Sequence, residues 1–296
     1  MRRRAVCGQH AGAQARRPRR REQGQEILSM LTQEQVARFR ADGFVKGSRV
    51  LDDVEVDELR AEMERVIDQR DRTDVPKPVQ LANLGTEERP IWQIVNIWQA
   101  SPAFERLIHH PTITEELAQL SGAGELRVWH DQIQYKPAEQ GGLLHWHQDA
   151  PLWPILTPDT QVTAWVALDD VDETNGCMSM VRGSHRWGDQ MDFLRRTEDD
   201  PALPETYDGN PVEVVLRPVA KGEVHFHHSL TWHGSHGNTS NRPRRAIAMH
   251  VMGDDTRYVA AGEHIMKRFV TVGDGELMTD EAFPVVWSRA ARPASR

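Results

Sequence analysis

Three side chains that can bind a metal ion alternate along a short stretch of this sequence. They are His145, His147 and Asp149. Alternate residues of an extended strand point to the same face, so all three could share one face. Only neighbours can bind the same ion, because positions i and i+4 of a strand lie about 13 Å apart at ~3.3 Å per residue. We favour His147 with Asp149, since a carboxylate completes the ligand type used by non-haem Fe(II) centres, and we expect His145 to lie beside the site.

A third ligand is expected from the histidine-rich segment 225–236. It offers five candidates, and their spacing alone does not separate them. A dicarboxylate co-substrate would need a bidentate guanidinium beside a hydroxyl donor, and Arg244 begins the apolar run that follows. This favours His233, across the hairpin from Arg244. Arg242 and Arg245 compete with Arg244 for that role, but strand alternation sends Arg244 and Arg245 to opposite faces.

Together these residues resemble the phytanoyl-CoA dioxygenase family. The resemblance covers roughly residues 30 to 260 and is carried by an HxD motif, a distal His-Gly-Ser, and an arginine eleven positions after that histidine (244 − 233). The matching residues are His147-Gln148-Asp149, Trp165, Asn175-Gly176-Cys177, Gly183-Ser184-His185, His233-Gly234-Ser235 and Arg244. Each motif alone is weak, whereas their order and spacing in combination are specific.

The resemblance implies a double-stranded β-helix in which His147, Asp149 and His233 bind Fe(II). By the same resemblance, Arg244 and Ser235 hold the far carboxylate of 2-oxoglutarate. The remaining co-substrate residues implied in this way are Trp165 and Gln134, which line the pocket, and Lys136 close to it.

The activity implied by the family is a dioxygenase reaction on a small-molecule substrate. O2 and 2-oxoglutarate are consumed, succinate and CO2 are released, and an aliphatic C–H bond is hydroxylated. Desaturation, epoxidation or ring closure stay open, because they differ only in the fate of the substrate radical. Asp149 argues against halogenation, since related halogenases lack this carboxylate.

The elements that must position these residues are mainly strands. From residue 125 onward, short runs rich in Val, Thr, Ile and Trp alternate with turn residues, which predicts a mainly β sandwich or jelly roll of the cupin-like kind. The predicted strands are 125–136, 143–149, 161–168, 176–182, 213–217, 223–233 and 244–252. Flanking helices are predicted at 32–42, 53–69 and, as a pair, over 102–120. Residues 188–211 are predicted to be a long loop, a lid or a binding loop.

Charge and length point to one acidic catalytic domain, residues 30–296, behind a disordered basic tail. Residues 1–29 hold eight Arg and two Glu, so subtracting their +6 from the overall −8 leaves −14 for the rest of the 296 residues. The tail is interpreted as an organelle-targeting or nucleic-acid-binding arm, or as sequence upstream of a natural start at Met30. The acidic body argues against nucleic acid as a partner. Two cysteines, no signal peptide and no long apolar run predict a cytoplasmic protein away from the membrane.

Simpler interpretations compete with these. Most of the fourteen histidines are expected to satisfy local hydrogen bonds, and Trp165 is as much a core aromatic as a pocket wall. A non-oxidative metal cupin, such as a hydrolase, lyase or isomerase, and a binding protein of the same fold are the rival functions. The substrate is not indicated, because the expected pocket walls at 71–98, 150–160 and 188–212 carry no group-binding motif. Their tryptophans suggest a partly apolar cavity for a natural product, whereas the acidic loops equally favour a basic substrate.

Overall fold

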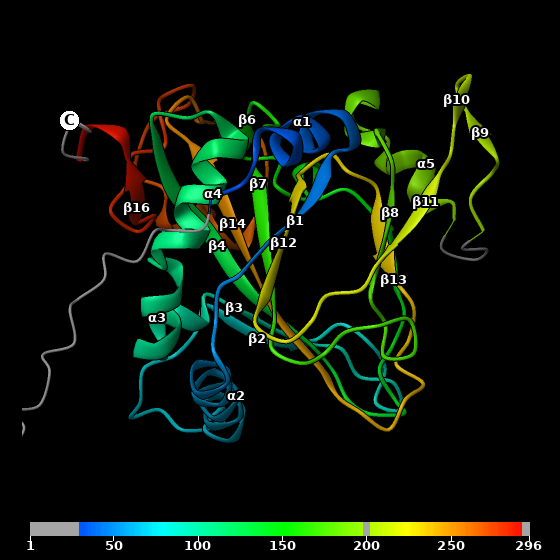
Figure 1. The fold of residues 1–296 in the computed structure, drawn as a ribbon. Coiled ribbons are helices and arrows are strands. Elements are labelled where there is room, and N and C mark those ends of the chain that lie inside the picture. The colour runs from blue at the N-terminus through cyan, green and yellow to red at the C-terminus, as the bar shows by residue number, and fades with distance from the viewer. Residues whose placement is uncertain (1–29, 198–201, 292–296) are drawn as a thin grey trace, which may run out of the picture.

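The computed structural model describes residues 30–197 and 202–291, which form two facing β-sheets with the helices of segment 53–121 packed on one side (Figure 1). The predicted tail 1–29 lies outside the described residues. The α-helices are α1 (Gln33–Asp42), α2 (Asp53–Asp68), α3 (Pro102–Ile108), α4 (Pro111–Ser121) and α5 (Met191–Arg195), and the short 3-10 helices are η1 (Ile97–Gln99), η2 (Ala150–Leu152), η3 (Ser184–Trp187), η4 (Ile265–Phe269) and η5 (Arg289–Ala291). In the part of the chain that the structure describes, none of the helices is both long and apolar enough to cross a bilayer.

The strands are β1 (Phe44–Arg49), β2 (Gln80–Asn83), β3 (Trp92–Val95), β4 (Glu125–Lys136), β5 (Leu144–His147), β6 (Leu156–Thr157), β7 (Val162–Ala167), β8 (Met178–Val181), β9 (Thr206–Tyr207), β10 (Asn210–Pro211), β11 (Val214–Arg217), β12 (Glu223–His228), β13 (His233–Ser235), β14 (Arg244–Gly253), β15 (Arg257–Tyr258) and β16 (Val285–Ser288). The large sheet runs β1-β12-β7-β14-β4-β3-β2, with β16 also pairing β4. The small sheet runs β11-β8-β13-β5. This mainly β, jelly-roll arrangement confirms the predicted fold class.

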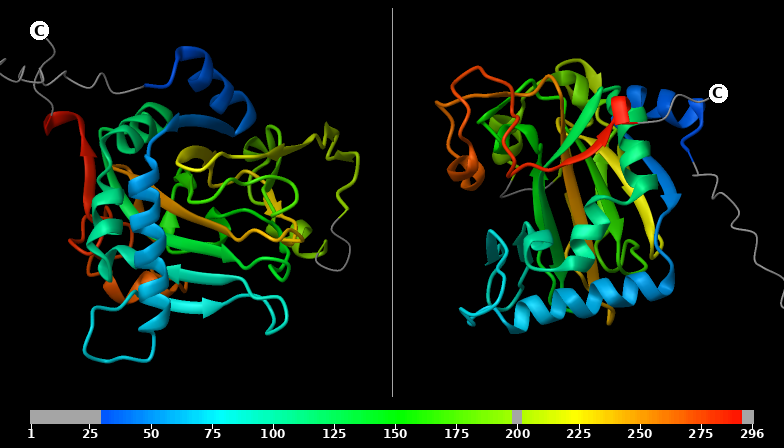
Figure 2. Two further views of the ribbon diagram at one scale, coloured as in Figure 1. Left: turned by 60° about the horizontal axis from the view of Figure 1, so that its bottom comes forward. Right: turned by 90° about the vertical axis from the view of Figure 1, so that its left-hand side faces the viewer.

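The N-terminal helices follow from local signals in the sequence. Thr32 caps α1 and exchanges hydrogen bonds with Gln35 as a capping box, and the helix ends at Gly43, whose φ of 87° is the left-handed conformation that glycine adopts without strain. Asp52 caps α2 in the same way with Glu55. The helices predicted at 32–42, 53–69 and 102–120 are confirmed. Helices α2, α3 and α4 lie on the same side of the large sheet (Figure 2).

Alternation along the strands divides the large sheet into two faces. One face packs against the helices through residues such as Ile133, Val166 and Ile247. The other face packs against the small sheet, where Trp165 and Ala248 meet methionines of β8 in a second core. Burying apolar surface contributes roughly 25 cal/mol per Å², so both cores favour the closed sandwich. The space between the sheets is where the predicted site residues gather.

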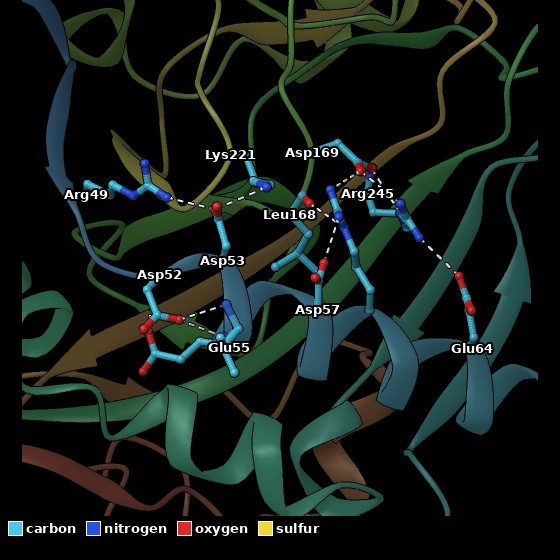
Figure 3. Close-up of polar contacts among 12 residues, drawn as sticks. Arg49, Asp52, Asp53, Glu55, Asp57, Glu64, Leu168, Asp169, Lys221 and Arg245 are labelled. Atoms are coloured by element: carbon cyan, nitrogen blue, oxygen red, sulfur yellow. Dashed lines mark hydrogen bonds and ion pairs between the residues drawn. The ribbon is translucent and has the colours of Figure 1, made fainter.

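Arg245 shows the helix side of this division (Figure 3). Its guanidinium and backbone both contact Asp169, with Nη2–Oδ1 and Nε–Oδ2 distances of 2.9 Å, and its Nη1 lies 3.0 Å from Glu64 of α2. Arg60 of α2 also binds Asp169, at 2.6 Å, and donates to the carbonyl of Leu168 at 2.7 Å. These ion pairs fasten α2 to the outer face of the sheet. The prediction that Arg245 points away from Arg244 is confirmed.

Two strand predictions and one loop prediction need correction. The predicted strand 223–233 is two strands in different sheets, β12 and β13, joined by a turn over 229–232. The predicted strand 143–149 ends at His147, and Asp149 instead lies directly before η2 as its N-cap residue, where its N–H donates to the carbonyl of Ser229 at 2.8 Å. The region 188–211, predicted to be an irregular loop, contains α5 and the small hairpin β9-β10 in its described part.

Candidate metal and co-substrate site

The structure brings His147, Asp149 and His233 together between the two sheets. His147 and His233 are cross-strand partners in β5 and β13, with ring centroids 4.1 Å apart. Asp149 Oδ1 lies 3.8 Å from His147 Nε2 and 3.6 Å from His233 Nε2. Each residue offers one ligand atom, and these atoms all lie within 4.8 Å of one another. His145, the competing histidine, is exposed at the edge of the site.

Backbone carbonyls set the tautomers of both histidines. His147 Nδ1 lies 2.8 Å from the carbonyl oxygen of His145, and His233 Nδ1 lies 2.9 Å from that of Thr231. A carbonyl only accepts, so each Nδ1 carries the proton and each Nε2 turns a lone pair toward Asp149. Burial, together with His233, lowers the pKa of His147 to about 4, and burial also lowers the pKa of His233. Both rings are therefore neutral near pH 7, the form that binds metals.

Asp149 presents its two carboxylate oxygens to different surroundings. Oδ1 faces the two histidine lone pairs, whereas Oδ2 lies 3.1 Å from His227 Nε2 and accepts from Thr163 Oγ1 at 3.2 Å. Thr163 in turn lies 2.7 Å from His250 Nδ1. Burial opposes ionisation of Asp149, but His233 and the His227 hydrogen bond outweigh it and hold its pKa well below the usual range. The carboxylate is thus ionised, and two neutral imidazoles with one carboxylate fit a divalent iron site with open positions.

Sequence reasoning missed the contacts of His227, Thr163 and His250 with Asp149. The two histidines were expected to have only local structural roles, and Thr163 was not singled out. Alternation did contain a signal: in the β12–β7 register His225 is opposite Trp165 and His227 is opposite Thr163, on the inner face. That signal becomes readable only when the two strands are known to pair.

Arg244 is buried between the sheets without a carboxylate partner among the described residues. Only 1% of its surface is exposed. Its guanidinium lies over the Trp165 ring at 5.1 Å, and its Nε donates to the carbonyl of Gly176 at 3.2 Å. Its Nη2 lies 3.4 Å from Ser235 Oγ, the hydroxyl predicted to accompany it. Burial lowers the Arg244 pKa to about 10, which marks an incompletely compensated charge.

Lys136 lies beside Arg244 as its cross-strand partner and is fully buried. Its Nζ donates to Ser235 Oγ at 2.7 Å and to the carbonyl of His236 at 2.6 Å. Burial and the neighbouring Arg244 lower its pKa well below the usual range. Two adjacent buried cations with neutral partners are costly unless an anion joins them. A carboxylate bound between them would compensate this buried charge.

Gln134 and Trp165 lie near both the metal triad and the Arg244–Lys136 pair. Trp165 Nε1 donates to Gln134 Oε1 at 3.3 Å. One small cavity is lined by both of these side chains and by Asp149 and His233 of the metal triad. Trp165 thus lies both at this cavity and under the Arg244 guanidinium, between the metal triad and the arginine. All eight predicted site residues lie in this one interior region.

The family model for phytanoyl-CoA dioxygenase matches residues 39–246 of this chain. The chain belongs to the phytanoyl-CoA dioxygenase family. It is 28% identical over 244 residues to the ectoine dioxygenase of Bordetella bronchiseptica (strain ATCC BAA-588 / NCTC 13252 / RB50), with 76% of each chain covered. It is 25% identical over 268 residues to the peroxisomal phytanoyl-CoA dioxygenase of Rattus norvegicus, covering 83% of this chain and 77% of the relative.

Two similar solved structures are enzymes of nogalamycin biosynthesis. The non-haem alpha-ketoglutarate-dependent carbocyclase SnoK from nogalamycin biosynthesis is 30% identical, with a TM-score of 0.68 and coverage of 87% of this chain and 97% of SnoK. The epimerase SnoN, in complex with Fe3+, alpha-ketoglutarate and nogalamycin RO, is 26% identical, with a TM-score of 0.68 and coverage of 86% and 98%. Family membership confirms the resemblance seen in the sequence, and the fold confirms its architecture.

Proposed function

We propose that this chain is an Fe(II)- and 2-oxoglutarate-dependent dioxygenase that hydroxylates an aliphatic C–H bond of a small molecule. The observation that carries the proposal is a His-Asp-His triad beside a cavity lined by Trp165, the ring over which Arg244 lies, with Arg244 and Lys136 buried and without a carboxylate partner in the described structure. The family model and the alpha-ketoglutarate-dependent relatives support the same reaction. A hydrolase, lyase or isomerase on this fold would have no use for Arg244 and Lys136, so the non-oxidative alternative is not favoured.

The triad provides the metal position. His147 Nε2, His233 Nε2 and Asp149 Oδ1 would hold Fe(II) from one side and leave its other positions open. Bound Fe(II) supplies O2 activation coupled to decarboxylation, so that R–H, O2 and 2-oxoglutarate give R–OH, succinate and CO2. The protein's part is to keep both imidazoles neutral and the carboxylate ionised before the metal arrives.

The two cations provide the co-substrate position. Arg244 would bind the far carboxylate of 2-oxoglutarate through charge-assisted hydrogen bonds, with Ser235 Oγ as a further donor and Lys136 as a second charge. Trp165 and Gln134 would flank the carbon chain between Arg244 and the metal. In this way the bound co-substrate supplies the negative charge that the interior lacks.

The nogalamycin enzymes support a natural-product intermediate as the substrate class. SnoK is a carbocyclase and SnoN an epimerase, so structurally similar chains direct the same oxidising centre to different outcomes. We keep hydroxylation as the expected reaction and a natural-product intermediate as the substrate class. The acidic charge of residues 30–296 supports a partner other than nucleic acid. The proposed catalytic domain is 30–296, and a cytoplasmic location rests on the low cysteine count.

An anaerobic titration tests this function. Metal-free protein is mixed with Fe(II) and 2-oxoglutarate, the iron-to-oxoacid charge-transfer band is recorded in the visible range, and O2 is then admitted while succinate is assayed. The expected result is a band and slow succinate release without substrate, both lost in His147→Ala and Arg244→Leu. Arg245→Leu is the matched control and should keep both. Absence of band and succinate from the wild-type protein at saturating concentrations would refute the oxygenase assignment.

A further inference from the structure

His227 is a buried histidine that is hydrogen-bonded to the triad without belonging to it. It is 2% exposed, its ring centroid lies 4.7 Å from that of His233, and its Nε2 lies 3.1 Å from Asp149 Oδ2. The triad uses the other oxygen, Oδ1. His227 therefore contacts the carboxylate on the side away from the proposed metal position.

The hydrogen bond fixes which group donates. An ionised carboxylate only accepts, so His227 Nε2 carries the proton. Thr163 Oγ1 donates to the same Oδ2, and its remaining contact, to His250 Nδ1 at 2.7 Å, is satisfied if that nitrogen carries the proton and the threonine oxygen accepts. Oδ2 thus accepts two hydrogen bonds, whereas Oδ1 faces two lone pairs.

The sheet holds these donors in a fixed relation. His227 pairs with Phe44 of β1 on one side and with Thr163 of β7 on the other, and Thr163 pairs in turn with His250 of β14. The three side chains form one row across three neighbouring strands of the large sheet. Asp149, which follows a strand of the small sheet, reaches across to this row. The position of its carboxylate is therefore set by a sheet that contributes none of the three ligands.

We infer that His227 is a positioning residue that keeps Asp149 a one-oxygen ligand, an inference that rests on the proposed function. With Oδ2 saturated by His227 and Thr163, only Oδ1 is free for the metal. Two histidines, one carboxylate oxygen, a bidentate oxoacid and O2 would together fill an octahedral iron site. A carboxylate that bound through both oxygens would take a position needed by one of the other ligands. Loss of the His227 donor frees Oδ2 to turn toward the metal.

Two amide substitutions make the test specific. Glutamine places its amide nitrogen near the position of the histidine Nε2, whereas asparagine reaches only as far as Nδ1. His227→Gln thus retains the donor to Asp149 and His227→Asn removes it while leaving a polar side chain of nearly the same size. His227→Leu removes the donor altogether. The matched control is His145→Leu, which replaces an exposed histidine two residues before His147.

Co(II) binding to the intact chain is the measurement, because its visible spectrum reports coordination geometry without turnover. His227→Asn and His227→Leu are expected to weaken Co(II) binding by about 10- to 100-fold, the usual effect of losing a hydrogen bond to a metal ligand, and to change the spectrum. His227→Gln and His145→Leu should stay within about 3-fold of wild type with its spectrum. Far-ultraviolet circular dichroism of the metal-free variants checks their fold.

The outcomes separate the two proposals. If wild type binds Co(II) but His227→Asn and His227→Gln behave alike, His227 is not a positioning residue and the inference fails while the proposed function stands. If His227→Gln abolishes binding as completely as His147→Ala, His227 is itself a ligand and the inference also fails. If wild type does not bind Co(II), the proposed function fails, and the inference fails with it.

Discussion

Arg244 and Arg245 are neighbours in the sequence and opposites in the structure. Arg245 lies on the helix side of the large sheet, where Asp169 and Glu64 neutralise it at 2.9 Å and 3.0 Å. Arg244 lies between the sheets, 1% exposed, with carbonyl and hydroxyl oxygens as its hydrogen-bond partners among the described residues. One charge is balanced within the chain and the other is left for a ligand. The lesson is that the absence of an internal partner, rather than burial or charge alone, distinguishes a binding arginine from a structural one.

The strongest test of this contrast is Arg244→Leu. Removing one partner of a buried charged pair costs about 2–5 kcal/mol of binding, so catalytic efficiency toward 2-oxoglutarate should fall by about 1,000-fold. Stability without co-substrate should not fall, because the substitution removes a buried charge that no carboxylate compensates. Initial rates of succinate release across 2-oxoglutarate concentrations, with thermal unfolding of the free protein, measure both. A variant that unfolds more easily yet keeps its affinity would reverse the roles assigned to the two arginines.

Acid should also destabilise the fold through His250, which burial keeps neutral near pH 7 although Asp149 lies 3.9 Å away. Burial lowers the pKa of His250 to about 4, below the ordinary value near 6.5. The unfolded chain therefore takes up the proton first, and stability falls as pH drops from about 6.5 to about 4, by at most about 3 kcal/mol for this one group. Denaturant unfolding of the metal-free protein at a series of pH values measures the slope.

His250→Asn is the matched variant for that experiment. Its amide nitrogen can donate to Thr163 as His250 Nδ1 does, but it cannot take up a proton in this range. Its stability should therefore depend less steeply on pH than that of wild type. Equal slopes would mean that the interior imidazole is not what makes the fold sensitive to acid.

The smallest expected effect belongs to Arg245→Leu. Asp169 keeps a partner in Arg60, so the loss of free energy of unfolding should be about 1–2 kcal/mol rather than the larger cost of a stranded charge. The Michaelis constant for 2-oxoglutarate should be unchanged. Chemical denaturation with parallel succinate assays gives both values, and a rise in that constant would show that the outer ion pairs also shape the interior site.

Much of the site could be predicted because it depends on neighbouring residues and on their spacing along the sequence. Alternation alone separated Arg244 from Arg245, and strand rise alone excluded His145 as a partner of Asp149. The capping box at Thr32 predicted the start of the first helix, and the spacing of apolar residues predicted the second to within about a residue. The assignment of His233 among five histidines needed the later arginine, and the remaining co-substrate residues needed the family resemblance.

The features that were missed depend on long-range contacts. The turn over 229–232 has no glycine or proline, so the run 223–233 reads as a single strand. In the structure its hydrogen bonds go to distant segments: Ser229 N–H donates to the carbonyl of Gln161, and Thr231 Oγ1 donates to that of Gly43. The row of His227, Thr163 and His250 likewise exists only once three strands are in register. A local sequence pattern cannot predict the contact between Thr163 and His250, because these residues lie 87 positions apart in the sequence.

Strand β14 carries Arg244 at its first position and His250 six positions later, and it is paired along its length by β4 and β7. A slip of one residue would turn every side chain to the opposite face, so the strand cannot adjust its position in small steps. The register of β14 therefore fixes the distance between the Arg244 guanidinium and the row of His227, Thr163 and His250 beside the proposed metal position. A keto diacid one carbon shorter or longer than the one that fits would have to give up one end or the other.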